Sequence, residues 1–169
     1  YGLAGAIITA VDLIKGLGML AGMEVVEVPG ATGYYDTDYA AKARYALESL
    51  RFSDLVYVHV EAPDEAGHEG DWEAKVEALE NFDAQIVGAF LDETVRSGEE
   101  FAFLLMPDHF TPLEVRTNVA DPVPFAVYYP HVVPDRGRSF SEKGVAGGSY
   151  AALPAWQLRD LLVEGTRRS

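Results

Sequence analysis

The sequence contains no cysteine, which excludes disulfide bridges and thiolate metal sites. Basic residues are also scarce, because 13 Lys and Arg stand against 27 Asp and Glu and give a net charge of -14. Nucleic acids and anionic membrane surfaces are bound through clustered basic side chains, so this charge argues against both as partners. A phosphorylated or carboxylated ligand would meet the same repulsion unless bound cations supplied positive charge.

Long apolar runs are absent as well. The longest uncharged run, Gly2 to Val11, is far shorter than the roughly 20 residues that cross a bilayer, and no basic segment precedes it as in a signal peptide. The absence of cysteine agrees with a cytoplasmic location, which we expect. The chain starts at Tyr1 without a methionine, so we expect a piece of a longer protein.

What the chain does have is enough apolar surface to fold. Of its 169 residues 49% are hydrophobic, including 9 Tyr and 8 Phe, which predicts one folded domain rather than a disordered acidic tail. β-Branched and aromatic runs predict strands at 5–10, 24–28, 54–61, 101–106 and 124–129. Helical spacing predicts helices at 11–22, from 36–38 to 50, from about 71 to 93, and at 153–165. This alternation predicts an α/β fold with a mostly parallel sheet covered on both faces.

The predicted helices carry apolar stripes that we expect to face the core. The first helix carries the stripe Leu13, Ile14, Leu17 and Leu20. The apolar contacts expected of the last helix are Trp156, Leu158, Leu161 and Leu162. The long third helix carries the stripe Val76, Leu79, Phe82, Ile86 and Phe90. Asp71 is the expected N-cap of that helix, and Gly22 the expected end of the first.

Two acidic and two imidazole side chains follow predicted strands. Asp64 and His68 lie in the expected loop EAPDEAGHEG after one strand, and Asp108 and His109 follow the next. Because the carboxyl ends of parallel strands meet at one edge of a sheet, we expect both pairs at the same edge. Carboxylate and imidazole donors suit Mn²⁺, Zn²⁺, Fe or Mg²⁺, and two clusters suit two metals that clamp a phosphoryl group.

Structural roles are the alternatives. Either pair alone occurs by chance in chains of this size, and carboxylates after strands also cap helices. His59 lies inside a predicted strand, where a hydrogen-bonded core role or a supporting role behind the ligands is favoured over metal ligation. Thr32 is expected in a turn rather than as a nucleophile, and His131 is expected at the surface.

Several long segments resemble the C-terminal part of one enzyme family. The segments GAIITAVDLIKGLGMLAGM, VYVHVEAPDEAGHEGD and MPDHFTPLEVRTNVADPVPFAVYY are similar to archaeal-type cofactor-independent (2,3-bisphosphoglycerate-independent) phosphoglycerate mutases, of the alkaline phosphatase superfamily. The resemblance is strong from Tyr1 to about Tyr129 and loose beyond. It implies an αβα sandwich that is incomplete here, with residues 1–169 forming the C-terminal portion of the metal-binding catalytic domain.

The resemblance also implies a ligand set. Carried over by position, Asp64 and His68 would bind one metal, and Asp108 and His109 the other. The family's ions are divalent, with manganese expected first and magnesium, zinc or cobalt as alternatives. A further family histidine of the first metal is replaced by Asn118, whose amide oxygen is a weaker ligand.

Further site candidates are less specific. His59 is expected to support the ligand loop, whereas Lys15 and Arg116 are candidates for touching a phosphate or carboxylate group. For both basic residues a solvated surface charge is the alternative.

The implied activity is an isomerase reaction of glycolysis and gluconeogenesis. Family members interconvert 3-phosphoglycerate and 2-phosphoglycerate, a small phosphorylated three-carbon acid, through a serine nucleophile. That serine, an early metal-ligand aspartate and a substrate-binding insert precede the matched part, and none of the seven serines here follows a strand as a nucleophile would. We therefore expect an inactive fragment with exposed edges that favour self-association. The alternatives are another phosphohydrolase or phosphonate-acting enzyme of the superfamily, or a non-catalytic metal-binding domain.

Overall fold

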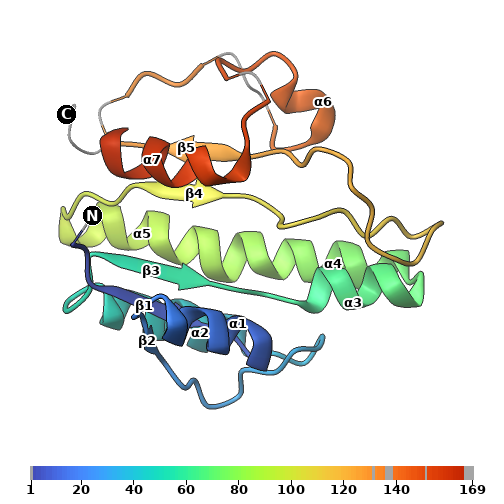
Figure 1. The fold of residues 1–169 in the computed structure, drawn as a ribbon, viewed down its shortest axis with the longest axis horizontal. Coiled ribbons are helices and arrows are strands. Elements are labelled where there is room, and N and C mark those ends of the chain that lie inside the picture. Colours follow the sequence, from blue (N-terminus) through green and yellow to red (C-terminus); the bar gives the residue numbers. More distant parts are fainter. Residues whose placement is uncertain (1, 131, 136–138, 151, 166–169) are drawn as a thin grey trace. The chain divides into compact units, whose positions relative to one another are not determined.

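The computed structural model describes residues 2–130, 132–135, 139–150 and 152–165. The chain forms two compact units, the first made of residues 1–97 and 111–117 and the second of residues 98–110 and 118–169 (Figure 1). The segment Thr111–Thr117 therefore leaves the second unit to join the first and then returns. Among the described residues, no helix is both long and apolar enough to cross a membrane.

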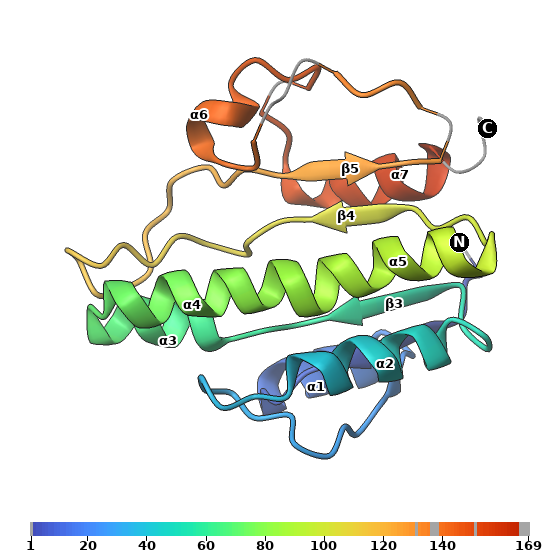
Figure 2. The ribbon, with the colours of Figure 1, turned by 180° about the vertical axis from the view of Figure 1, so that it is seen from behind.

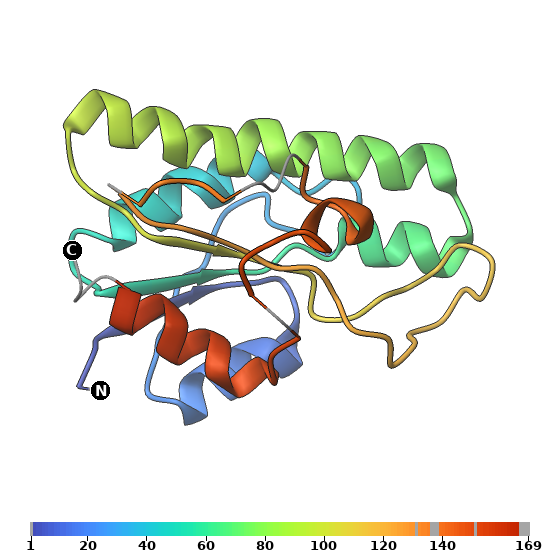
Figure 3. The ribbon, with the colours of Figure 1, turned by 90° about the horizontal axis from the view of Figure 1, so that it is seen from above.

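The first unit is built on a three-stranded parallel sheet. Its strands are β1 (Gly5–Ile8), β2 (Glu24–Val25) and β3 (Leu55–Val58), in the order β2-β1-β3. The connections run through α1 (Asp12–Leu20) and α2 (Tyr39–Ser49), which Figure 3 shows on opposite faces of the sheet. Right-handed crossovers to opposite sides of β1 require this placement. The strand order therefore reverses between β1 and β3, where sheets of this class bind ligands at their carboxyl ends.

The ends of α1 and α2 follow the expected capping chemistry. Gly22 has φ 77° just beyond α1, and Met23 donates its backbone N–H to the carbonyl of Gly18. The predicted stop at Gly22 is thus confirmed as the left-handed residue after the helix. The N-cap of helix α2, Asp38, lies within the predicted start at 36–38, and its carboxylate accepts from the backbone N–H of Ala41 at 2.8 Å.

The apolar stripe of α1 does not face the core as predicted. Leu13 is 70% exposed, Leu17 54% and Leu20 87%, whereas Ile14 is half-buried and Gly18 is the residue of α1 that is buried. The physical reason is close packing, because a Cβ on Gly18 would lie 2.7 Å from a methyl carbon of Ile7. The helix therefore meets β1 through its glycine side and presents its leucines outward.

The segment after β3 is a helix rather than the predicted loop. Helix α3 spans Ala62–Glu69 and carries its proline in the first turn, where the missing N–H costs no hydrogen bond. It ends at Gly70, whose φ of 74° is the left-handed conformation that glycine adopts without strain. The Gly, Pro and Asp residues of EAPDEAGHEG led to the prediction of a loop, but eight of its residues form a helix.

The long third helix exists but contains a π-helical turn. Asp71 caps it as predicted, accepting from the N–H of Ala74 at 3.0 Å. The helix runs through α4 (Trp72–Phe82), the π-segment η1 (Asp83–Val87) and α5 (Gly88–Ser97), in one continuous line (Figure 2). Ile86 and Phe90 of the predicted stripe are buried, but Val76 and Leu79 are exposed and Ala78 is buried in their place. The extra residue of the π turn shifts the phase of the stripe.

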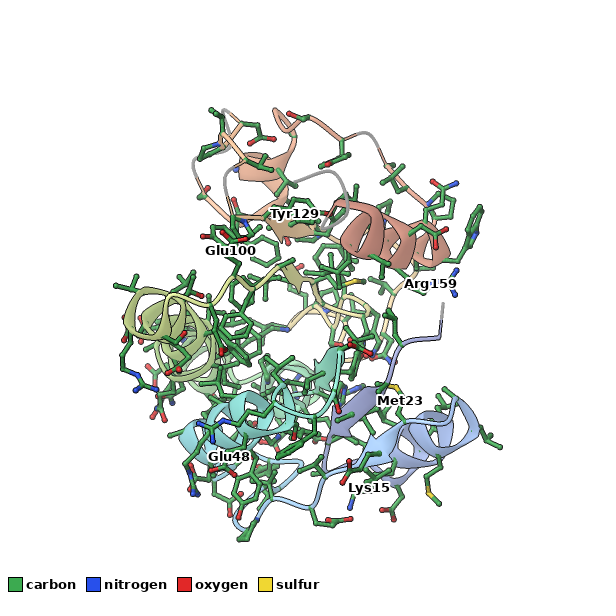
Figure 4. All side chains as sticks on the ribbon, turned by 90° about the vertical axis from the view of Figure 1, so that its left-hand side faces the viewer. Lys15, Met23, Glu48, Glu100, Tyr129 and Arg159 are labelled. Atoms are coloured by element: carbon green, nitrogen blue, oxygen red, sulfur yellow. The ribbon has the colours of Figure 1, made fainter. Side chains whose placement is uncertain are left out.

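The second unit contains an antiparallel pair of strands. These are β4 (Phe103–Leu105) and β5 (Ala126–Tyr128), followed by α6 (Glu142–Val145) and α7 (Ala155–Gly165). Tyr129 lies beside α7 (Figure 4), and its hydroxyl donates to the carbonyl of Leu161. Of the predicted apolar contacts of α7, Leu158 is confirmed as buried, whereas the expectation for Trp156 is wrong because it is 67% exposed.

Candidate metal centre

Asp64 and His68 form the first candidate ligand pair, on α3. Their positions i and i+4 put both side chains on one face of the helix. Oδ2 of Asp64 lies 3.5 Å from Nε2 of His68. Two ligand atoms that each lie 2.0–2.2 Å from a shared metal are separated by about 3.0–3.5 Å, so the spacing suits a single divalent ion.

The imidazole of His68 is held from its other side. Nδ1 lies 3.0 Å from the backbone carbonyl oxygen of Arg116, in the segment Thr111–Thr117. A carbonyl oxygen accepts but cannot donate, so Nδ1 carries the hydrogen and the neutral ring keeps its lone pair on Nε2. Metal-binding histidines commonly have this arrangement, with one ring nitrogen on the metal and the other donating to a carbonyl.

Asp64 is held by the same segment. The hydroxyl of Thr111 donates to Oδ1 of Asp64, and Thr111 is only 4% exposed. The Thr111 carbonyl in turn accepts from Nζ of Lys75 at 2.6 Å. Burial lowers the pKa of Lys75, and the charge of Asp64 opposes that shift. One oxygen of Asp64 thus binds the threonine while the other lies beside His68.

We call Thr111–Thr117 the bracing segment, because Thr111 contacts Asp64 and Arg116 contacts His68. Gly67, between the two ligands, lets it approach. A Cβ on Gly67 would lie 2.5 Å from the carbonyl oxygen of Thr111, well inside any normal contact. The fit of this pair to a divalent ion therefore depends on residues far along the chain, since Thr111 lies 47 positions after Asp64 and Arg116 lies 48 positions after His68.

His59 lies at the switch point of the sheet, immediately after β3. Its Nδ1 is 3.2 Å from the hydroxyl of Thr9, which follows β1. Its carbonyl accepts from Nζ of Lys42 at 3.2 Å, and Lys42 is only 1% exposed. Burial lowers the pKa of Lys42, while the nearby charge of Glu61 opposes that shift. Burial likewise raises the pKa of Glu61.

The second pair belongs to the second unit. Oδ2 of Asp108 lies 3.5 Å from Nε2 of His109, and the His109 backbone N–H donates to Oδ1 of Asp108 at 3.0 Å. Nδ2 of Asn118 also lies 3.5 Å from Nε2 of His109. The carboxylate of Asp108 and the imidazole of His109 are thus as far apart as those of Asp64 and His68, and the amide of Asn118 lies beside His109. That the two pairs meet at one edge of a sheet stays a prediction.

The remaining candidates have structural partners. Nζ of Lys15, on α1 (Figure 4), pairs with both carboxylate oxygens of Glu27, at 3.0 and 3.1 Å. Thr32 donates its hydroxyl to Asp36 at 2.6 Å within a turn, as expected. His131 lies outside the described residues.

Sequence reasoning missed the residues that hold the ligands. Thr111, Lys75 and Lys42 belong to no sequence motif, and no signal in the sequence marks them as neighbours of the ligands. In the described parts of the chain, no group of three or more His, Cys, Asp or Glu side chains is arranged around one point. Each pair therefore offers two side-chain ligands, a carboxylate and an imidazole, and divalent ions accept both kinds.

The chain is similar to named mutases over nearly all of its length. It is 52% identical over 165 residues to the 2,3-bisphosphoglycerate-independent phosphoglycerate mutase of Methanosarcina acetivorans, covering 97% of this chain and 42% of that protein. The enzyme of the same name from Methanothrix thermoacetophila is also 52% identical, with 98% and 42% covered. The chain thus spans about two fifths of the length of these curated relatives.

Two solved structures share the fold. A Pyrococcus horikoshii protein superposes with a TM-score of 0.89 at 30% identity, over 99% of this chain and 50% of that one. The cofactor-independent phosphoglycerate mutase of Thermoplasma acidophilum gives 0.67 at 23% identity, over 96% and 36%. The predicted α/β class and the resemblance are confirmed. A family profile matches residues 1–165, and the chain belongs to the Metalloenzyme superfamily.

Proposed function

We propose that this chain supplies part of the metal centre of a phosphoglycerate mutase that interconverts 3-phosphoglycerate and 2-phosphoglycerate. The similarity to relatives of that name supports the reaction. One structural observation carries the proposal for the site. Asp64 Oδ2 and His68 Nε2 lie 3.5 Å apart while the other ring nitrogen of His68 is fixed to a carbonyl.

Each ligand pair has a defined task in this proposal. Asp64 and His68 hold one divalent ion, and Asp108 and His109 hold a second, with manganese expected first. When bound, such ions neutralise phosphate oxygens and favour the deprotonated form of a nucleophilic hydroxyl. The four side chains bring anionic and neutral donors, and the chain's charge of -14 would otherwise repel a phosphorylated acid.

The supporting residues keep the first pair in position. Thr111 donates to one oxygen of Asp64, which leaves the other oxygen directed beside His68. His59 and Lys42 anchor the chain where β3 leads into α3, three residues before the ligand helix begins. Preorganised ligands bind an ion without a further ordering cost, which is the advantage of this arrangement.

The chain by itself is proposed to lack mutase activity. The expected phosphoserine intermediate needs a serine at the end of a strand, activated by the metals. The described serines do not meet that requirement: Ser49 and Ser97 end helices, Ser53 precedes β3, Ser141 caps α6, and Ser139 and Ser149 lie in the segments on either side of α6. In the enzyme, the nucleophile and the groups that recognise the glycerate come from outside this chain.

A manganese titration tests the metal proposal. Isothermal calorimetry of the wild-type chain should show saturable Mn²⁺ binding, and Asp64→Asn or His68→Gln should weaken it by about tenfold or more. Glu80→Gln is the matched control, because Glu80 is an exposed carboxylate on α4. A wild-type chain without Mn²⁺ binding, or site variants that bind like the control, would refute the site.

A ³¹P NMR assay tests the activity proposal separately. The chain incubated with 3-phosphoglycerate and Mn²⁺ should form no 2-phosphoglycerate. Formation of product would contradict the proposal that the nucleophile lies elsewhere, without bearing on the metal ligands.

A non-catalytic metal-binding domain is the second candidate, favoured by the amide of Asn118 at a family histidine position. Imidazole binds divalent ions more strongly than an amide oxygen does. Asn118→His should therefore raise Mn²⁺ affinity if this position belongs to a metal site. An unchanged affinity would argue that Asn118 serves His109, from which its amide nitrogen lies 3.5 Å away.

The partners follow from the same proposal. The substrate is a small phosphorylated three-carbon acid, and neither nucleic acid nor membrane fits the charge. The exposed leucines of α1 support self-association, because exposed apolar residues that gather on one helix face favour burial against another surface. Light scattering after gel filtration should give a mass above that of one chain, and Leu13→Glu should return it to one chain.

A further inference from the structure

We infer that Arg116 is a positioning residue for the metal ligand His68, acting through its left-handed backbone and its carbonyl oxygen. This inference rests on the proposed metal function of Asp64 and His68. The carbonyl of Arg116 is the partner that fixes the hydrogen on Nδ1 of His68 and leaves Nε2 for the ion.

The backbone of Arg116 is unusual. Its φ is 56°, which makes it the one non-glycine residue with positive φ in the described part of the chain. Its N–H donates to the carbonyl of Pro112 at 2.8 Å, closing a single helical turn with a left-handed end. Glycine is the usual residue at such an end, because a Cβ is disfavoured there. An arginine at this position needs a compensating contact.

That contact is with the residue that ends α3. Gly70 itself has φ 74°, and a Cβ built on it would lie 2.5 Å from Nε and 2.7 Å from Cζ of Arg116. The guanidinium therefore lies against the bare Cα of Gly70. Arg116 is attached to α3 twice, through its carbonyl at His68 and through its side chain at Gly70.

The two attachments explain the choice of residue. A glycine at position 116 would adopt the left-handed turn without strain and would still present its carbonyl to the imidazole. An ordinary residue without a long side chain would disfavour the turn and gain nothing at Gly70. Arginine carries a Cβ that disfavours the turn, and its contact with Gly70 compensates, so the turn keeps its carbonyl at the imidazole. Strained backbone that the surroundings hold in place is typical of functional sites.

The tautomer of His68 is the direct readout. Long-range ¹H–¹⁵N NMR of the metal-free chain near pH 8 should show the Nδ1–H form of His68 in the wild type. In Arg116→Ala the Cβ that disfavours the turn remains but the contact with Gly70 is lost, so His68 should shift toward the Nε2–H form. Arg116→Gly keeps the left-handed turn accessible and should stay close to wild type. Arg51→Ala, at another exposed arginine, is the matched control.

Mn²⁺ affinity provides the second readout. Loss of a group that orients a ligand histidine weakens metal binding by about 10–100-fold, which we expect for Arg116→Ala and not for Arg116→Gly or the control. Circular dichroism checks that each variant is folded. If the alanine variant does not fold, the glycine variant still tests the inference. A wild-type tautomer and affinity in Arg116→Ala would overturn the inference, as would equal losses in the glycine and alanine variants. If the wild-type chain binds no Mn²⁺, the proposed function fails, whereas the tautomer still decides the role of Arg116.

Discussion

Gly67 offers a direct test of how closely the bracing segment packs on the ligand helix. It lies within α3 between Asp64 and His68, and it is buried. A Cβ at this position would lie 2.5 Å from the carbonyl oxygen of Thr111, 2.8 Å from its methyl carbon and 2.9 Å from Nζ of Lys75. Gly67→Ala should therefore push the bracing segment away from the helix.

The expected magnitude follows from opposing effects. Alanine is favoured over glycine inside a helix by about 1 kcal/mol. Overpacking a buried contact costs about 1–3 kcal/mol, and loss of the charged hydrogen bond from Lys75 to Thr111 adds about 1.5–3 kcal/mol if the carbonyl moves. Because these costs overlap when the same displacement causes both, we expect a net loss of about 2 kcal/mol in the free energy of unfolding.

Gly16 provides the matched control. It lies in α1, and a Cβ there would meet nothing within 4 Å. Gly16→Ala should therefore stabilise the protein by up to about 1 kcal/mol through helix propensity alone. The same substitution is therefore expected to lower the free energy of unfolding at Gly67 and to raise it at Gly16.

Urea unfolding followed by circular dichroism measures both variants. A second measurement, the Mn²⁺ affinity of Gly67→Ala, should fall, because Thr111 would no longer hold Asp64. Equal stabilisation by both substitutions would refute the reasoning, since it would mean that the bracing segment does not contact Gly67 as closely as these distances require.

Three further predictions concern capping and buried charge. Asp71→Ala removes the side-chain acceptor for the N–H of Ala74 and should lower the free energy of unfolding by about 1 kcal/mol in urea titrations, whereas an unchanged midpoint would contradict the cap. Gly22→Ala has open space for its methyl group but a φ of 77°, so it should destabilise the chain by about 1 kcal/mol, and stabilisation would show that the left-handed end is absent. Burial holds the pKa of Lys42 below its ordinary 10.5, so the unfolded chain binds more protons between the folded pKa and 10.5. The stability of the wild type relative to Lys42→Met should therefore rise as the pH increases toward about 10, and a difference independent of pH would contradict a buried amine.

Local patterns predicted the elements of this chain better than their faces. The five strands that the structure describes all lie within the expected runs, since β-branched and aromatic runs report on burial directly. The faces of α1 and α4 were assigned wrongly because they depend on other elements. Gly18 packs on Ile7, and the π turn at Asp83–Val87 shifts the register of the long helix. Neither effect is visible in a repeat of apolar residues.

The sequence by itself determined which residues carry the chemistry and how they are spaced. The donor types of Asp64 and His68 and their separation by four positions are chemical facts of the chain, and so are the aspartate caps and the net charge. Only the tertiary structure decided that these two residues share a helix face and that Thr111 and Arg116 hold them from a distant segment. The physical reason is that the direction of an imidazole or a carboxylate is set by its hydrogen-bond partners, and here those partners are distant in sequence.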